Sequence, residues 1–214
     1  MGRVVGVARI FDVHPDNPQP RHLAEAVKLL RQGGVMVYPT DSCYAIGCMI
    51  GNKDGMASIR QIREVDDKHH FTLICRDLSE IARYARVDNR QYRFLKAATP
   101  GGYTFILEAT REVPRRLLHP KRSTIGLRVP DHKVIAALLE ELNEPILSMT
   151  LQLPGHDYPL NDPDDIIDCL DNRVDVILTC GYCGIEPTTV IDLSGPVPEL
   201  IRQGTGDAAR LGLQ

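Results

Sequence analysis

Along most of the 214 residues, segments with the apolar spacing of one helix face (apolar stripes) alternate with short apolar runs. This alternation limits the chain to a few fold classes. In residues 21–32, apolar side chains recur at the i, i+3, i+4 and i+7 spacing of one helix face. This helix is predicted to end at Gly33-Gly34, because glycine accepts the left-handed conformation of a C-terminal cap. The apolar run 35–38 that follows predicts a buried strand.

The same alternation continues to residue 202. Further stripes predict helices at 56–62, 78–82, 134–138 and 163–170, and apolar runs predict strands at 71–75, 103–107, 124–129, 146–149, 174–178, 189–193 and 199–202. Asp131 and Asp162 are the predicted N-caps of the last two helices, and residues 207–214 are predicted to form a loose tail. Interleaved helices and strands favour a mixed α/β (α+β) fold with some parallel strand pairs, and short connections favour one domain over residues 1–214.

Composition excludes several classes of protein. Hydrophobic residues make up 43% of the chain and charged residues 25%, which is enough apolar material to offset the entropy of ordering. No apolar run reaches the roughly 18 residues of a transmembrane helix, and residues 1–13 are too polar for a secretory signal. We therefore expect a cytoplasmic protein with no membrane partner and with its six cysteines as free thiols.

Charge is distributed unevenly, although the formal net charge is −3. Residues 111–122 carry five basic side chains against Glu112, whereas residues 157–175 carry seven aspartates against Arg173. Two interpretations stay open: both segments are solvated faces, or the basic segment forms a rim over an anion site. A protein whose whole surface is basic is excluded.

Three loops that follow strands are rich in hydroxyl or cationic side chains, at residues 39–44, 63–70 and 186–189. Ligands of open sheets lie beyond strand ends, where hydroxyls bind carboxylates or phosphates and cations bind polyphosphates. A nucleophile pair of Cys43 and His70 is an alternative, although we favour structural roles for both. The lone Cys180-x-x-Cys183 lacks the two further ligands of a zinc site, so we expect no metal bound directly by the protein.

Five segments together resemble the signature motifs of the YrdC-like family: PTDSCYAIG at 39–47, PGGYTF at 100–105, TIGLRV at 124–129, PTTVIDL at 187–193 and LIRQG at 200–204. They occur in the family's order, and the likeness extends over about residues 17–206. Four more segments are similar to the YciO branch of that family: FDVHPDNP at 11–18, HFTL at 70–73, CRDLSE at 75–80 and VPRRLL at 113–118.

The resemblance implies a YrdC/RibB-like fold, a three-layer twisted mixed sheet with flanking helices around a positively charged cavity. It implies L-threonylcarbamoyladenylate synthase activity, in which L-threonine, bicarbonate and ATP yield threonylcarbamoyl-AMP and pyrophosphate for the t6A modification of tRNA. ATP would be a substrate, with Mg²⁺ bound through the nucleotide. The alternative is a protein that binds structured RNA (double-stranded RNA, tRNA or rRNA) and has a degenerate nucleotide pocket.

The resemblance also assigns roles to single positions. Side chains implied to bind the amino acid substrate are Thr40, Ser42, Tyr44, Arg128, Thr150 and Thr188. Side chains implied to bind the nucleotide are Arg63, Lys68, His69, Thr124, Gln152, Thr189 and Arg202. The catalytic set implied is Arg63, Lys68 and Arg128.

The chain departs from the family's motifs at the positions expected to hold the nucleotide. The family's K-x-R falls on Arg63-Glu64-Val65, which keeps one cation, and Lys68 is expected to replace the other. The S-x-N motif falls on Thr150-Leu151-Gln152, and the N-P motif falls on His69-His70. A charge-assisted contact contributes about 1.5–3 kcal/mol, so one lost cation weakens the hold on a triphosphate by about 10- to 100-fold.

Overall fold

The computed structural model describes residues 6–214, and within them ten strands form one mixed sheet. The strands are β1 (Arg9–Asp12), β2 (Met36–Tyr38), β3 (Ala45–Met49), β4 (Thr72–Ile74), β5 (Tyr103–Glu108), β6 (Thr124–Arg128), β7 (Ile146–Thr150), β8 (Val176–Thr179), β9 (Thr189–Asp192) and β10 (Glu199–Arg202). Their order across the sheet is β1-β8-β2-β3-β7-β4-β6-β5-β9-β10. The pairs β1–β8, β2–β8, β4–β6 and β5–β9 are parallel and the rest are antiparallel, which confirms the predicted mixed sheet.

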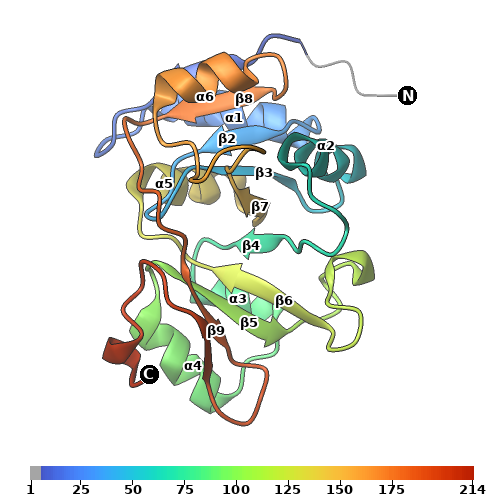
Figure 1. The fold of residues 1–214 in the computed structure, drawn as a ribbon, viewed down its shortest axis with the longest axis vertical. Helices are drawn as coiled ribbons and strands as arrows, with labels where there is room; N and C mark the ends of the chain where they lie inside the picture. Colours follow the sequence, from blue (N-terminus) through green and yellow to red (C-terminus); the bar gives the residue numbers. More distant parts are fainter. Residues whose placement is uncertain (1–5) are drawn as a thin grey trace.

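Helices cover both faces of this sheet (Figure 1). They are α1 (Pro20–Arg31), α2 (Lys53–Arg63), α3 (Leu78–Tyr84), α4 (Asn89–Ala98), α5 (Lys133–Leu142) and α6 (Pro163–Leu170). Helices α1 and α5 pack together over one face of β2 and β8, and α2 and α6 cover the other face. Helices α3 and α4 belong to the same apolar core as β5, β6 and β9. Among residues 6–214, no helix combines the length and the apolar character needed to cross a membrane.

Strand β2 shows why the central strands have uninterrupted apolar sequences. The side chains of Met36 and Tyr38 belong to the core under α1 and α5, whereas Val37 belongs to the core on the opposite face. All three are fully buried, since successive strand residues point to opposite faces and both faces are covered here. The continuous apolar run at 35–38 is therefore a correct indicator of a buried strand.

The structure confirms the predicted helices and strands, with shifts of a few residues at their ends. Helix α6 has the predicted bounds, and the Asp162 side chain caps it by accepting a hydrogen bond from the Asp164 N–H at 3.0 Å. The N-cap of α5 differs from the prediction: it is His132 rather than Asp131. The Asp131 N–H instead donates to the Asp41 carboxylate at 2.9 Å, because this segment is held against the turn at residues 39–44.

Three elements and the C-terminal segment differ from the sequence-based expectation. The alternation of stripes and runs does not predict β1, β3 or α4. The prediction of a loose tail at 207–214 is wrong, because Ala208 is buried and Leu211 packs against the core. The Tyr103 hydroxyl donates to the Asp207 carbonyl oxygen at 3.1 Å and holds the segment beside β5.

Gly47 lies in β3 between β2 and β7, where the neighbouring strand leaves no room for a side chain. A Cβ at this position would lie 2.6 Å from the Leu147 carbonyl oxygen and 2.6 Å from Ile146 Cγ2. We expect Gly47→Ala to lower the free energy of unfolding in urea by about 1–3 kcal/mol, because the added methyl group displaces backbone. Gly195→Ala is the control, since the nearest atom to its Cβ, the Val197 carbonyl oxygen, is 3.8 Å away. An equal loss in both variants would contradict this explanation.

Candidate functional site

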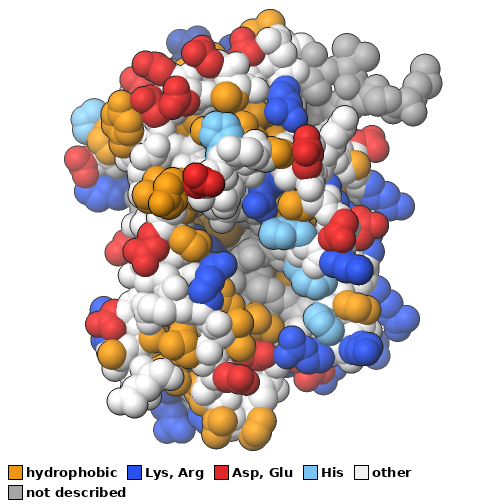
Figure 2. Space-filling view, in the orientation of Figure 1, with side chains coloured by type: hydrophobic (Ala, Val, Ile, Leu, Met, Phe, Trp, Pro, Cys, Tyr) orange, Lys and Arg blue, Asp and Glu red, His pale blue; other side chains and the backbone are white. Residues whose placement is uncertain are grey.

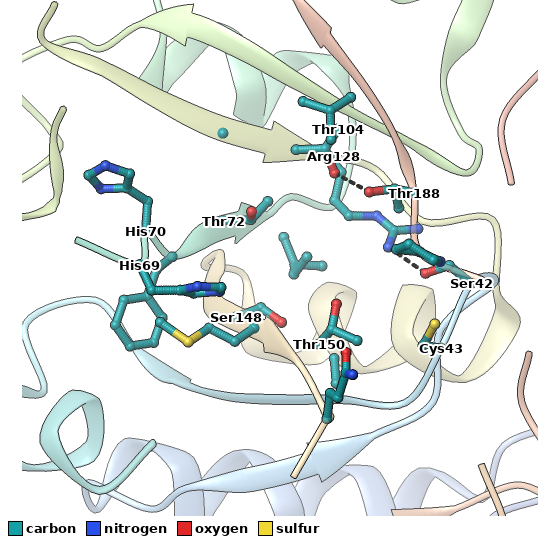
Figure 3. A pocket seen from close by; sticks show the side chains of 18 of the residues that line it. Ser42, Cys43, His69, His70, Thr72, Thr104, Arg128, Ser148, Thr150 and Thr188 are labelled. Carbon is teal, nitrogen blue, oxygen red and sulfur yellow. Dashed lines mark hydrogen bonds between the residues drawn. The ribbon is translucent and has the colours of Figure 1, made fainter. Parts of the chain in front are cut away.

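A cavity of about 780 Å³ lies on one face of the sheet, where β4, β5, β6, β7 and β9 meet (Figures 2 and 3). Apart from Ile125, the residues of β4, β5, β6 and β9 that line it are at alternate strand positions: Thr72 and Ile74 of β4, Thr104 and Ile106 of β5, Thr124, Gly126 and Arg128 of β6, and Val190 of β9. The residues between them, such as Leu73, Phe105 and Leu127, are fully buried in the core on the opposite face. Strand alternation thus separates a polar cavity wall from an apolar packing face.

Gly126 keeps the wall of this cavity open. A Cβ at this position would lie 3.3 Å from Thr104 Cγ2 and 3.3 Å from Thr72 Oγ1. Ser148 of β7 adds a further buried hydroxyl, which accepts a hydrogen bond from the buried Tyr38 hydroxyl. The cavity therefore combines a row of hydroxyl groups with space for a ligand between them.

Arg128 is the most strongly held cation of the cavity. It is the last residue of β6, and only 5% of its surface is exposed. Its Nη1 donates to Ser42 Oγ at 3.0 Å, and its Nη2 forms an ion pair with the Asp41 carboxylate (Figure 3 shows the contact with Ser42). The Nε–H is buried and has no hydrogen-bond partner among the described residues. The guanidinium is thus fixed in place while its hydrogen-bonding capacity is not used up.

The turn at residues 39–44 is organised by Thr40. Its Oγ1 donates to the Cys43 carbonyl oxygen at 2.6 Å and accepts from the N–H groups of Ser42 and Cys43 at 3.2 Å. A side-chain oxygen that bonds the backbone two and three residues on stabilises a tight turn. Thr40 lines the cavity as expected, but its hydroxyl group serves to aim Ser42 at Arg128.

Hydroxyl groups from two more segments lie on this side of the cavity. Thr188 Oγ1 and Thr104 Oγ1 form a hydrogen bond of 2.8 Å, which Figure 3 shows above Arg128. Arg202 also lines the cavity, and its Nε and Nη2 donate to the Thr188 carbonyl oxygen at 3.2 and 2.9 Å. Tyr44 contributes its ring, because its hydroxyl donates to the Gly181 carbonyl oxygen at 2.6 Å.

The opposite end of the cavity is built around Arg63, at the end of α2. Its Nε donates to the Gln152 carbonyl oxygen at 3.3 Å, and its Nη1 donates to His69 Nε2 at 3.0 Å. Burial lowers the pKa of Arg63 and of His69. The Gln152 side chain donates to the carbonyl oxygens of His156 and Asp157 at 3.2 and 3.3 Å, which closes the loop that follows β7.

The structure brings most of the expected site residues to one cavity, and it leaves two outside. The residues that line it are Thr40, Ser42, Tyr44, Arg63, His69, Thr124, Arg128, Thr150, Gln152, Thr188 and Arg202. Lys68 does not line it: its side chain is exposed, and its N–H donates to Asp66 Oδ1 at 3.0 Å. Thr189 is fully buried on the other face of β9, where its Oγ1 donates to the Gly206 carbonyl oxygen at 2.5 Å and accepts from the Gly204 N–H at 2.8 Å.

Several cavity residues are absent from the expected set. They include Thr72, Thr104, Ser148, His70, His119 and Arg122. The period of two along β4 and β5 points to Thr72 and Thr104, because each lies next to a buried apolar residue. His119 and Arg122 carry no such signal, since they come from the irregular loop before β6 and reach the cavity through the fold. Arg122 forms an ion pair with Asp192 at 3.0 Å.

The cysteines near the cavity have structural contacts. Cys43 Sγ donates to the Glu186 carbonyl oxygen at 3.2 Å, and burial raises the pKa of this thiol to about 11. Cys43 and His70 lie on opposite sides of the cavity in Figure 3, which does not favour a nucleophile pair. Burial likewise raises the pKa of Cys183 to about 12.

Among residues 6–214, no group of three or more His, Cys, Asp or Glu side chains is placed to hold a metal ion.

A mixed sheet with helices on both faces and a polar cavity against one of them defines an α/β protein of the YrdC fold. The sequence model of the Sua5/YciO/YrdC family, described as "Telomere recombination", matches residues 28–204. The chain belongs to the Sua5/YciO/YrdC family. It is 53% identical to the uncharacterised protein YciO of Escherichia coli K12 over 201 residues, which cover 94% of this chain and 98% of YciO.

Solved structures and a more distant relative agree with this assignment. The crystal structure of E. coli YciO matches with a TM-score of 0.91 over 95% of this chain and 99% of YciO. The structure of Pyrococcus abyssi Sua5 in complex with L-threonine is 20% identical and has a TM-score of 0.84, covering 92% of this chain and 58% of Sua5. The threonylcarbamoyl-AMP synthase of Halorhodospira halophila is 28% identical over 180 residues, covering 83% of this chain and 93% of the synthase.

Thr188 and Thr189 provide a matched pair, because neighbouring residues point to opposite faces. We expect Thr189→Val to lower the free energy of unfolding by about 1–3 kcal/mol, since it leaves the buried Gly204 N–H without its acceptor and leaves the Gly206 carbonyl with Gln203 Nε2 as its remaining donor. Thr188→Val should cost less than about 1 kcal/mol, because Thr104 can turn its hydroxyl to the cavity. Urea denaturation of both variants measures the difference, and equal losses would contradict the placement of Thr189.

Proposed function

We propose that the protein is a nucleotide-dependent enzyme of the threonylcarbamoyl-AMP synthase type. The observation that carries the proposal is the buried Arg128, fixed by Asp41 and Ser42 at one side of a hydroxyl-lined cavity. A fixed guanidinium beside hydroxyl groups suits a carboxylate that belongs to a small hydroxy amino acid. The names of two relatives support this choice, the Halorhodospira synthase and the Sua5 complex with L-threonine.

The size and the two-ended character of the cavity support a second ligand. About 780 Å³ is in the range of small-molecule sites and leaves space beyond a single amino acid. In this proposal the amino acid contacts Ser42, Arg128 and Thr188, and the nucleotide extends toward Arg63. Thr150 would be a further contact of the amino acid, and the remaining nucleotide contacts would be Thr124, His69, Gln152 and Arg202, all of which line the cavity.

The reaction requires positioning more than acid–base chemistry. The threonine amine and bicarbonate form a carbamate with loss of water. A carbamate oxygen then attacks the α-phosphorus of ATP, and the bond to the leaving pyrophosphate breaks. The protein would align the two ligands and offset their negative charge. Mg²⁺ would enter with the nucleotide, held by its phosphates and by water.

A second candidate function is binding of structured RNA, and one observation favours it. Four basic side chains of residues 111–122 are exposed and do not line the cavity: Arg111, Arg115, Arg116 and Lys121. Figure 2 shows basic side chains gathered beside the lower edge of the central hollow. A group of exposed cations contacts phosphates without reading sequence, as double-stranded RNA recognition requires.

Pyrophosphate release with ATP, L-threonine, bicarbonate and Mg²⁺ tests the enzyme proposal. We expect release that depends on threonine and that falls by about 10- to 100-fold in Arg128→Lys, because lysine keeps the charge but loses the forked hydrogen bonds. Arg86→Lys is the matched control, since Arg86 forms an exposed ion pair with Glu108 at 3.4 Å. Threonine-independent release, or equal rates in both variants, would sink the proposal.

Filter binding to a short RNA duplex at two salt concentrations tests the second candidate. If it is correct, the fourfold alanine variant of Arg111, Arg115, Arg116 and Lys121 loses affinity, and the wild-type affinity falls steeply with salt. Arg128→Lys should bind duplex RNA as the wild type does, because Arg128 is buried. Salt-independent binding would count against it.

A further inference from the structure

Histidine side chains line the end of the cavity that lies away from Arg128. They are His69 and His70, which follow α2, and His119, which precedes β6. Figure 3 shows His69 and His70 on the side opposite Ser42, and Figure 2 shows histidine side chains along the edge of the hollow. The ring centroids of His70 and His119 are 5.7 Å apart, so two separate loops meet here.

The hydrogen bonds of His69 and His119 indicate which of their ring nitrogens accept. Arg63 Nη1 lies 3.0 Å from His69 Nε2, and a guanidinium can only donate, so this ring nitrogen accepts and carries no proton. His119 Nδ1 accepts from the N–H groups of Lys121 and Arg122 at 3.3 and 3.2 Å. The other ring nitrogen of His119, Nε2, is then the one that can donate a hydrogen bond. Burial, together with neighbouring positive charge, lowers the pKa of His69 and His70.

The charged groups around the cluster leave Arg63 as an available cation. Helix α2 contributes Arg60 and Arg63, and Arg60 is paired with Asp67 at 3.4 Å and lies over the Phe71 ring at 5.1 Å. The other charged groups near the cluster are Asp66 after α2, Arg122 before β6, which is paired with Asp192, and Asp157 after β7. Arg63 has no carboxylate partner among residues 6–214.

We propose that His69 and His70 form a proton-coupled subsite for the phosphates of the ligand, with the Nε2–H of His119 as a further donor. This inference rests on the proposed function for the presence of a nucleotide. An anion placed between Arg63 and His69 accepts hydrogen bonds from both, which allows His69 to gain a proton without facing the guanidinium directly. His70 gains a proton in the same field, and the negative charge holds both imidazoliums. When pyrophosphate leaves, the two protons leave the protein as well.

Protonation of His69 and His70 supplies positive charge that the other side chains of the loop after α2 do not bring to the cavity. Glu64 and Val65, which follow Arg63, carry no positive charge, and Lys68 is exposed and does not line the cavity. Two histidines that charge on binding supply the missing positive charge only while the anion is present. The pKa of each histidine is then lower in the free protein than in the complex. Binding of the anion therefore strengthens as pH falls, and this gain in affinity disappears above the pKa that the histidine has in the complex.

Calorimetric titration with inorganic pyrophosphate, without threonine or bicarbonate, tests this inference. For each protein, the affinity at about pH 6 is divided by the affinity at about pH 8. We expect this ratio to be about tenfold larger in the wild type than in the double variant His69→Asn/His70→Asn. Pyrophosphate itself also changes protonation between these pH values, but this change is the same for all variants and cancels in the comparison. Repeating it in buffers of different ionisation enthalpy should show proton uptake by the wild type and less uptake by the double variant.

Two single variants separate charge from contact. His119→Asn should weaken binding at both pH values, because it removes the Nε2–H donor of His119. His14→Asn is the matched control, since His14 Nδ1 also accepts from two backbone N–H groups, at 3.2 and 3.1 Å, and it does not line the cavity. Absence of pyrophosphate binding, or the same pH ratio in the wild type and the double variant, would overturn the inference. A normal result here with no synthase activity would count against the proposed function alone.

Discussion

The structure depends on one buried guanidinium. Arg128, the last residue of β6, is 5% exposed and lies against the turn at 39–44, and a buried charge is tolerated only when it is paired and hydrogen-bonded. Asp41 and Ser42 supply the partners, and the second oxygen of Asp41 accepts from the Asp131 N–H. The Arg128 carbonyl oxygen also accepts from the Cys75 N–H at 2.8 Å. One side chain and its own backbone thus fasten four separate segments, and the cavity exists because they are held there.

Strand alternation accounts for what the sequence could predict of this site. The buried strands were recognisable from apolar runs such as 35–38, and the hydroxyl groups facing the cavity follow the period of two on β4, β5 and β6. The same rule separates Thr188 from Thr189, since Val190 faces the cavity and Ile191 belongs to the core. A motif match treats both threonines as ligand contacts, whereas the register of β9 assigns one to the cavity and one to the packing of residues 203–206.

The parts that could not be predicted depend on contacts distant in sequence or on local backbone geometry. His119 and Arg122 reach the cavity from a loop of irregular structure, about 50 residues from His69 and His70, and no periodic pattern marks them. Lys68 turns outward because the chain after α2 enters the left-handed region at Glu64, with φ of 50°, and Asp66 then binds the Lys68 N–H. Strand β3 escaped recognition because Gly47 interrupts its apolar run, although close packing requires a glycine there.

The net charge of −3 does not reveal how much positive charge the cavity offers to an anion. Four arginines line it, but Arg128 is neutralised by Asp41 and Arg122 by Asp192, while Asp157 and Glu186 add negative charge at its edge. Arg63 and Arg202 have no carboxylate partner among residues 6–214, so the fixed positive charge available to a polyanion is small. A site of this kind holds a triphosphate more firmly if it gains positive charge on binding, and imidazoles beside Arg63 are groups able to gain it near neutral pH. Binding of the anion then weakens as these imidazoles lose their protons. Release of a highly charged product would therefore depend on the pH of the surrounding solution.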